Sequence, residues 1–372
     1  MKKVGLLGGG QLGKMILPHA HRLDIQITVL DSADCVCAEM THHHIVGDFK
    51  NPEDVKKLAD QDAVTIEIEH VSVEGLRKLE AQAVRVAPSS MIVELIQDKG
   101  LQKKFLKDQK IATASFEVKR LAATDTFSND VVVKLCRGGY DGKGVWIPKE
   151  GQSVPVGFQT EVVIEPKIEI EKEISVIVAR CSSGAMATYP VVEMVFNSEL
   201  NLIDSTFCPA NITQEQSQEA TELAQKVAQK LEIVGVIAVE MFITKEGKLL
   251  VNELAPRVHN SGHFTIEACY TDQFEQHLRA VANLPLGKCD LRESGMTINI
   301  IGAAGYTGET TVSGLDKILE IPKVYVHLYG KNDCRPGRKM GHVTILGDRE
   351  HCLKIKKEVE KWLVVKGTEK LV

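Results

Sequence analysis

The first hundred residues alternate between short apolar runs and amphipathic stretches, and this alternation constrains the fold more than any other feature. A helix is expected at 12–23, and strands are expected at 4–7, 27–31, 63–68 and 84–87. Strands that alternate with helices build a parallel sheet with helices on its faces. We therefore predict an α/β fold that begins with a doubly wound, Rossmann-like domain over residues 1–98.

Two further parts are expected downstream. Strand patterns dominate 111–177, and beyond them come a helix at 217–231, two strands between 235 and 253, and a basic, strand-rich tail. A length of 372 residues suits two to three domains. We predict a small domain over 99–170 and a larger one over 171–372 that ends in a small β-rich part.

The composition excludes several classes of protein. The 45 Lys and Arg residues against 50 Asp and Glu give a net charge of −5, which argues against a nucleic-acid or membrane-surface binder. The sequence contains no run of eighteen apolar residues, which is about the length needed to cross a membrane. The nine cysteines are scattered, which suits free thiols in a reducing cytoplasm, and no signal peptide is expected at the start.

A glycine loop follows the first strand. Gly8-Gly9-Gly10-Gln11-Leu12-Gly13 fits the G-x-G-x-x-G pattern, and Asp31 closes the next strand. One interpretation is a dinucleotide site with Asp31 on a ribose hydroxyl; the other is a tight first turn that serves some other anion. Gln11 is expected to point toward whatever binds there.

Two acidic residues end the third predicted strand. Glu67 and Glu69 lie where the ligands of parallel sheets gather, although a solvated strand end would explain them equally well. The nearby His42-His43-His44 is interpreted as a surface tract, because adjacent residues of a regular element cannot all face one ion.

A second glycine-rich segment, Gly138–Gly144, joins predicted strands at 131–135 and 144–147. It lacks the spacing of a Walker A loop. Its four glycines with Arg137 and Lys143 favour a mobile, cationic cover for polyphosphate, and Lys134 on the preceding strand adds a fixed charge. A plain surface hairpin is the alternative.

The most informative pattern lies at 239–253. Two strands are expected to join through a two-residue turn, Glu246-Gly247, so that Lys245 faces Lys248 and Glu240 lies directly opposite Glu253. Two adjacent carboxylates repel each other unless they share a cation such as Mg²⁺. An exposed acidic pair is less compatible with the apolar neighbours on both strands.

Two basic loops complete the candidate site. Residues 254–263 place Arg257, His259 and further polar residues directly after the carboxylates, which suits the binding of a small oxyanion. Residues 331–342 carry four cations against one acid, which indicates a phosphate-bearing substrate or, alternatively, a solvated basic loop.

Together these motifs resemble the ATP-grasp ligases and, within them, the N5-carboxyaminoimidazole ribonucleotide synthetase family. The resemblance spans nearly the whole chain and rests on residues 138–144, 252–263 and 335–342, with the first glycine loop and Glu67-x-Glu69. It implies an ATP-grasp fold and a carbon–nitrogen ligase that uses ATP, Mg²⁺ and bicarbonate to carboxylate 5-aminoimidazole ribonucleotide in purine biosynthesis. It also implies a homodimer and a separate mutase that acts next.

The resemblance assigns a role to each site residue. ATP would contact Lys99, Lys134, Gly138, Gly139, Tyr140, Asp141, Gly142, Lys143, Gly144, Glu165, Pro166, Lys167, Ile168, Glu173, Asn252 and Glu253. Magnesium would lie between Glu240 and Glu253. Arg257, His259 and Lys143 would be catalytic. The ribonucleotide would contact Gln11, Glu67, Tyr140, Asp141, Arg257, Lys331 and Arg338.

Two positions depart from the family pattern. Lys99 stands where the family usually has Arg, and Phe196 stands where a histidine on the ATP side is expected. Alternative functions are a neighbouring purine-pathway ATP-grasp ligase such as the formate-dependent glycinamide ribonucleotide transformylase, a non-catalytic nucleotide sensor, or an NAD-binding dehydrogenase.

Overall fold

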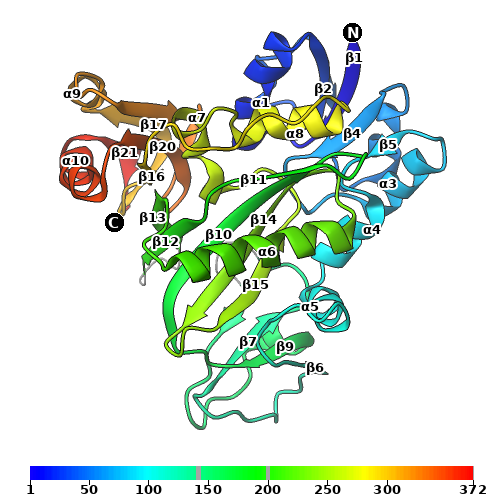
Figure 1. Ribbon diagram of the computed structural model, residues 1–372, viewed down its shortest axis with the longest axis vertical. Helices are drawn as coiled ribbons and strands as arrows, with labels where there is room; N and C mark the ends of the chain where they lie inside the picture. Colours follow the sequence, from blue (N-terminus) through cyan, green and yellow to red (C-terminus); the bar gives the residue numbers. More distant parts are fainter. Residues whose placement is uncertain (140–143, 198–201, 372) are drawn as a thin grey trace.

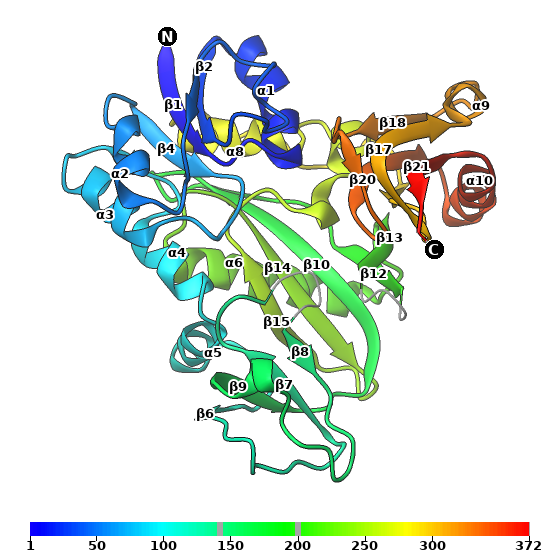
Figure 2. The same cartoon turned by 180° about the vertical axis from the view of Figure 1, so that it is seen from behind.

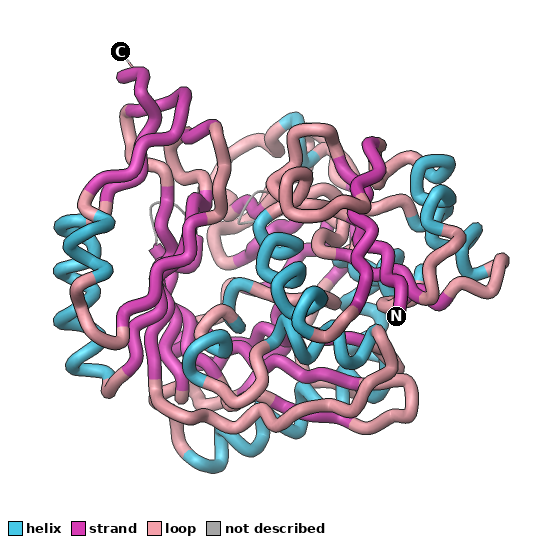
Figure 3. Tube along the Cα trace, turned by 90° about the horizontal axis from the view of Figure 1, so that it is seen from above, coloured by secondary structure: helices cyan, strands magenta, loops and turns pink. Residues whose placement is uncertain are grey.

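The structure is a computed structural model that describes residues 1–139, 144–197 and 202–371 (Figure 1). Its strands form sheets of five, nine, four and three strands. Seen from above, the N-terminus and the C-terminal strands lie on opposite sides of the molecule (Figure 3). The α/β class predicted from the alternating pattern is confirmed.

The N-terminal sheet is parallel throughout, with the strand order β3-β2-β1-β4-β5. Its strands are β1 Lys2–Leu7, β2 Ile25–Asp31, β3 His44–Val46, β4 Ala63–Ile66 and β5 Arg85–Val86; its helices are α1 Gln11–Arg22, α2 Pro52–Val55, η1 Lys56–Leu58, α3 Val73–Glu80 and α4 Ser90–Ile96. The order reverses between β1 and β4, so the carboxyl ends of these two strands open the crevice in which such sheets bind ligands.

The nine-stranded sheet runs β15-β14-β10-β12-β13-β16-β20-β18, with β11 paired to β10. Its strands are β10 Ile170–Arg180, β11 Met186–Thr188, β12 Val192–Asn197, β13 Leu202–Cys208, β14 Gly235–Thr244, β15 Leu249–Ala255, β16 Gly295–Ile301, β18 Val324–Leu328 and β20 Lys339–Leu346. Because β13 pairs with β16, strands β10–β15 and the C-terminal strands β16, β18 and β20 form one continuous sheet.

Two helices sandwich the centre of this sheet. Helix α6 (Gln214–Leu231) packs its alanine and leucine side chains on one face, and α8 (Gln273–Val281) covers the other. The apolar side of α8 also packs against α1, and the two helices share one hydrophobic core with β1 and β2. Helix α8 therefore lies between the N-terminal sheet and the large sheet (Figure 1).

The four-stranded sheet β6-β9-β7-β8 lies at the far end of the molecule, after α5 (Figure 2). Its bounds are α5 Lys99–Asp108, β6 Glu117–Arg120, β7 Val131–Leu135, β8 Val145–Trp146, η2 Val156–Phe158 and β9 Glu161–Pro166. The remaining elements are η3 Asn260–Gly262, α7 Thr265–Ala268, β17 Tyr306–Ser313, α9 Leu315–Leu319, β19 Asp333–Cys334, α10 Arg349–Trp362 and β21 Val364–Lys370.

All nine cysteines carry free thiols. Within the described ranges, no helix combines the length and the apolar character that crossing a bilayer requires.

Candidate active site

The first glycine loop is occupied by side chains of the chain itself. Glu67, which follows β4, accepts hydrogen bonds from the amides of Gly10 and Gly13 at 2.5 Å each, and Asp31 accepts one from Gly9 at 2.7 Å. Burial raises the pKa of the Glu67 carboxyl, and these amide donors oppose the rise. The groups that would bind a dinucleotide are therefore already engaged, which argues against the dinucleotide interpretation.

The same loop meets the C-terminal basic segment. Lys331 Nζ donates to Gln11 Oε1 at 2.5 Å and to the carbonyl oxygen of Lys339 at 2.7 Å. Gln11 is the first residue of α1, so this contact joins the opening crevice to the basic loop. Arg338, by contrast, contacts Asp333 within its own hairpin at 3.1 Å. The structure thus brings together Gln11 and Lys331, two of the seven predicted contacts of the ribonucleotide.

A buried ion-pair network joins α5, β7 and β9 and reaches β15. One carboxylate oxygen of Glu165, on β9, pairs with Lys134 at 2.7 Å, and the other pairs with Lys103. The Glu165 side chain is only 5% exposed. Lys134 also donates to Asn252 Oδ1 at 2.9 Å. Burial opposes ionisation of Glu165, but the two lysines outweigh it and hold the pKa of its carboxyl below the usual value. Lys134, Glu165 and Asn252 therefore meet as predicted for an ATP site.

Two lysines of this region were missed by the sequence analysis. Lys103 lies four residues after Lys99 on α5, a spacing that places both on one face of the helix and could have signalled the pair. Lys339, the first residue of β20, lies close enough to act electrostatically on both Glu240 and His259. Only its place in the basic segment 331–342 pointed to it.

Glu240 and Glu253 are partners on adjacent strands, as predicted. The predicted two-residue turn is wrong: Thr244 N–H donates to the Lys248 carbonyl, so the loop has three residues, 245–247, and Ile243 pairs with Leu249. A β-bulge corrects the shift, because Val251 pairs with Met241 and leaves Asn252 as the extra residue before Glu253.

The carboxylates near this bulge repel one another. Burial, followed by the charges of Glu253 and Glu173, raises the pKa of Glu240 to about 8, and burial raises that of Glu173 to about 7. Burial also opposes the ionisation of Glu253, but Lys99, which contacts its Oε1, outweighs burial and lowers the pKa. Two carboxylates beside the Asn252 amide offer hard oxygen donors, which are the ligands that Mg²⁺ prefers.

The loop after β15 brings two of the predicted catalytic residues, Arg257 and His259, to acidic partners. Arg257 pairs with Glu69 at 2.7 Å, and His259 Nε2 lies 3.3 Å from Glu240 Oε1. The Ser261 amide donates to His259 Nδ1 at 3.2 Å, so in the neutral ring the proton is on Nε2 and faces Glu240. Burial, aided by the charges of Arg257 and Lys339, lowers the pKa of His259 and keeps this ring neutral.

The structure describes part of the flap, the glycine-rich segment 138–144, and all of the predicted hinge, residues 165–168. Gly138 and Gly144, at the two ends of the flap, have φ values of +81° and +79°, which glycine adopts without strain. Gly139 is described, whereas Tyr140, Asp141, Gly142 and Lys143 lie outside the described residues. Of the predicted hinge residues, Pro166 ends β9, and Lys167 and Ile168 connect β9 to β10 and so join the small sheet to the large one.

Comparison with known families follows the same order along the chain. The ribonucleotide synthetase preATP-grasp domain matches residues 1–97, the ATP-grasp domain matches 104–274, and the phosphoribosylaminoimidazole carboxylase C-terminal domain matches 296–356. These three matches cover the glycine loop, the two carboxylates and the basic segment, respectively.

Similar proteins span the whole chain. N5-carboxyaminoimidazole ribonucleotide synthase of Bacillus subtilis is 36% identical over 93% of this chain and 92% of its own length. The N5-carboxyaminoimidazole ribonucleotide synthetase structure from Thermotoga maritima is 39% identical, with a TM-score of 0.90 and coverage of 99% of this chain and 100% of its own.

A second similar structure contains ligands. The Aspergillus clavatus N5-carboxyaminoimidazole synthase in complex with ADP and 5-aminoimidazole ribonucleotide is 30% identical over 97% of each chain, with a TM-score of 0.84. Relatives named phosphoribosylaminoimidazole carboxylase are longer; this chain spans 64% of the one from Vigna aconitifolia. With the site described above, these similarities show that the chain belongs to the N5-carboxyaminoimidazole ribonucleotide synthase family of ATP-grasp ligases.

Proposed function

We propose that this protein uses ATP and bicarbonate to convert 5-aminoimidazole ribonucleotide into N5-carboxyaminoimidazole ribonucleotide, through carboxyphosphate, in de novo purine biosynthesis. The observation that carries the proposal is the Glu240–Glu253 pair, which lies between the lysine network of the small sheet and the Arg257–His259 loop. A nucleotide bound on the lysine side of this pair and a small oxyanion bound on the Arg257–His259 side would be close enough to react.

The residues at this pair fit a nucleotide with Mg²⁺. The carboxylates of Glu240 and Glu253 would hold the ion, which would neutralise charge on the transferred phosphate. Lys134 and Asn252, which already contact each other, would bind the phosphates together with Lys99 and the flap glycines Gly138, Gly139, Gly142 and Gly144. Glu165, Pro166, Lys167 and Ile168 would form the adenine hinge, and Glu173 would bind the ribose.

The loop after β15 would handle bicarbonate. The guanidinium of Arg257 and the Nε2–H of His259 would donate to its oxygens and stabilise the charge that develops as carboxyphosphate forms. A neutral His259 acts here as a hydrogen-bond donor, consistent with its burial beside Glu240. Lys143 would close over the phosphates as the third catalytic residue and exclude water.

The aminoimidazole ribonucleotide would lie between α1 and the basic segment. Gln11, Lys331 and Glu67 supply donors and acceptors at the carboxyl ends of β1 and β4. Arg257, Tyr140, Asp141 and Arg338 complete the proposed contacts. For Arg338 this requires that its guanidinium leave Asp333, with which it pairs in the free protein.

The proposal includes the organisation of the protein. We place the domain divisions at residues 98 and 170, and we expect a cytoplasmic homodimer that passes its product to a separate mutase. The free thiols of all nine cysteines support a reducing compartment.

Phosphate release tests the proposal. We expect purified protein with Mg²⁺ and ATP to release phosphate only when bicarbonate is added, and at full rate only with 5-aminoimidazole ribonucleotide. A matched reaction replaces bicarbonate with formate. Phosphate release that formate supports, or that needs neither acid, would overturn the proposal.

A further inference from the structure

We infer that Gln273 is a positioning residue that holds the His259 loop in its working conformation; the inference rests on the proposed function. Gln273 is the first residue of α8 and is fully buried. It lies outside the sets of residues proposed to contact ATP, bicarbonate or the ribonucleotide. It acts through the main chain of His259.

The Gln273 side chain binds both backbone polar groups of His259. Its Oε1 accepts the His259 N–H at 2.8 Å, and its Nε2 donates to the His259 carbonyl oxygen at 2.7 Å. The second Nε2 hydrogen reaches His263 Nδ1 at 3.2 Å. One amide therefore fixes the residue that faces Glu240 and the histidine that follows the η3 turn.

The close packing leaves this loop little freedom. A Cβ built on Gly262 would lie 2.5 Å from Gln273 Oε1 and 2.3 Å from Ile177, so glycine is required for this approach. With its backbone held, His259 presents Nδ1 to the Ser261 amide and directs Nε2 at Glu240. Loss of the amide would release the main chain of His259 and let the imidazole move away from Glu240, although the His259 side chain itself is unchanged.

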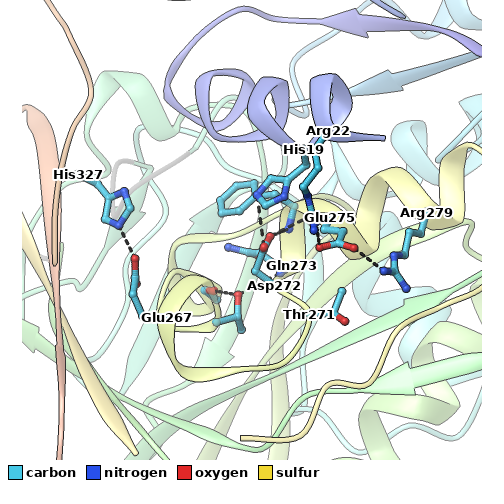
Figure 4. A network of polar contacts seen from close by, with 12 residues as sticks. His19, Arg22, Glu267, Thr271, Asp272, Gln273, Glu275, Arg279 and His327 are labelled. Atoms are coloured by element: carbon cyan, nitrogen blue, oxygen red, sulfur yellow. Dashed lines mark hydrogen bonds and ion pairs between the residues drawn. The ribbon is translucent and has the colours of Figure 1, made fainter. Parts of the chain in front are cut away.

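Helix α8 is itself anchored to the N-terminal domain (Figure 4). Asp272 caps the helix by accepting the amides of Phe274 and Glu275, and His19 of α1 contacts its other oxygen at 3.3 Å. Glu275 pairs with Arg22 of α1 and, at 2.5 Å, with Arg279. Gln273 therefore projects from a rigid support shared with the crevice that begins at α1.

The cluster of His19, Asp272 and Glu275 supports the packing of α8 and is not a metal site. Side-chain ligand atoms of His19, Asp272 and Glu275 lie within 4.8 Å of one another. Both Glu275 oxygens, however, already face guanidinium groups, and two nearby cations oppose the binding of a third. The residues therefore hold α8 against α1.

The helix also supplies a matched control. Gln276 is equally buried and makes the same two-point contact with a backbone: its Oε1 accepts the Gly287 N–H at 2.8 Å and its Nε2 donates to the Gly287 carbonyl at 2.7 Å. Its loop, however, contains none of the proposed site residues. Q273M and Q276M thus each remove a pair of hydrogen bonds between α8 and the backbone of a loop. Only Q273M removes them from the loop that carries His259.

Steady-state kinetics separate the two variants. We expect Q273M to lower kcat for bicarbonate-dependent phosphate release by about 10- to 100-fold with little change in the KM for ATP, because a displacement near 1 Å has such an effect on a catalytic group. Q276M should stay within about twofold of the parent protein, since only structural packing is altered. Equal losses in both variants, or full activity in Q273M, would overturn the inference.

A second variant and a second measurement guard against misfolding. Q273E keeps the acceptor for the His259 amide and, as the neutral acid that full burial favours, offers one donor where glutamine has two, so its kcat should be intermediate. In protein labelled with ¹⁵N-histidine, NMR should report the Nε2-protonated form of His259 in the parent and in Q276M, and a tautomer mixture in Q273M. An unchanged His259 signal in Q273M would refute the positioning role, whether or not the parent protein shows the proposed activity.

Discussion

Lys331 Nζ lies 2.5 Å from Gln11 Oε1, and this hydrogen bond joins residues 320 positions apart. It holds the beginning of α1 against the basic segment of the C-terminal sheet. Neither residue is near the other in sequence, yet both were expected to contact the same ligand. The ammonium group is thereby held at the crevice above β1 and β4, where a phosphate would need it.

Lys331→Met should weaken binding of the ribonucleotide specifically. Removal of one charge-assisted contact with a phosphate costs about 1.5–3 kcal/mol, so the KM for 5-aminoimidazole ribonucleotide should rise by at least about tenfold. The KM for ATP should change little. Lys57→Met, on an exposed ion pair, is the control in initial-rate assays. A parallel rise in both KM values would contradict the assigned role.

Glu240→Gln should remove activity but stabilise the free protein. The folded state raises the pKa of Glu240 to about 8, so ionisation at pH 7.5 favours the unfolded chain, in which this pKa is near 4.5. An amide avoids that penalty, and we expect a gain of about 1–3 kcal/mol in the absence of Mg²⁺.

Thermal unfolding at pH 7.5 checks this gain, with Glu246→Gln in the exposed turn as the control. The rate of phosphate release should fall by at least about 100-fold, as for loss of a group that acts on the transition state. A destabilised or active Glu240→Gln protein would contradict the expectation.

Glu165→Gln should be destabilising until a lysine is also removed. The substitution leaves Lys103, which is 3% exposed, without its buried carboxylate partner, at a cost of about 3–5 kcal/mol. Adding Lys103→Met removes the uncompensated charge and should restore most of the loss. Urea unfolding of the two single variants and the double variant measures the coupling; additive effects would show that the buried pair contributes nothing.

Two buried histidines should each reduce the stability of the protein as the pH falls below about 6.5, a contribution opposite in sign to that of Glu240. Burial lowers the pKa of His277 to about 4 and that of His263 to about 3, whereas the unfolded chain takes up protons near 6.5. Protonation in this interval therefore favours unfolding, and each ring contributes about 1.4 kcal/mol per pH unit until its folded pKa is reached.

Urea titrations between pH 7.5 and 5 measure this slope. His277 bridges Thr65 on β4 and the Val236 amide on β14, and His277→Gln should reduce the slope by about one proton. The exposed His42→Gln variant should leave it unchanged. An unaltered slope in His277→Gln would show that this ring is protonated in the folded protein.

The local patterns of the sequence predicted the elements well, but the details came from packing. Alternating strands and helices predicted the parallel sheet, and the register of the expected turn predicted the paired Glu240 and Glu253. That pairing holds although the predicted turn was one residue too short, because the bulge at Asn252 restores the register. Bulges follow from side-chain packing across strands, which no single strand reveals.

Long-range contacts were the least accessible part. Lys103 pairs with Glu165, and Gln273 forms hydrogen bonds with the backbone of His259. Both contacts join segments whose relative position is set by the sheets. Arg338 shows the converse case, because it pairs locally with Asp333 at 3.1 Å and its ligand contact stays a prediction. Charge patterns identify candidates, and only tertiary structure selects among their partners.

The position of Glu67 limits what this glycine loop can become. The chain has supplied its own anion to the amino end of α1, through hydrogen bonds to Gly10 and Gly13. A diffusing phosphate would have to displace a tethered competitor whose local concentration is effectively fixed. The glycine loop therefore resembles a dinucleotide site, but its amide donors are blocked by Glu67. A different substrate could still bind at the edge of the loop.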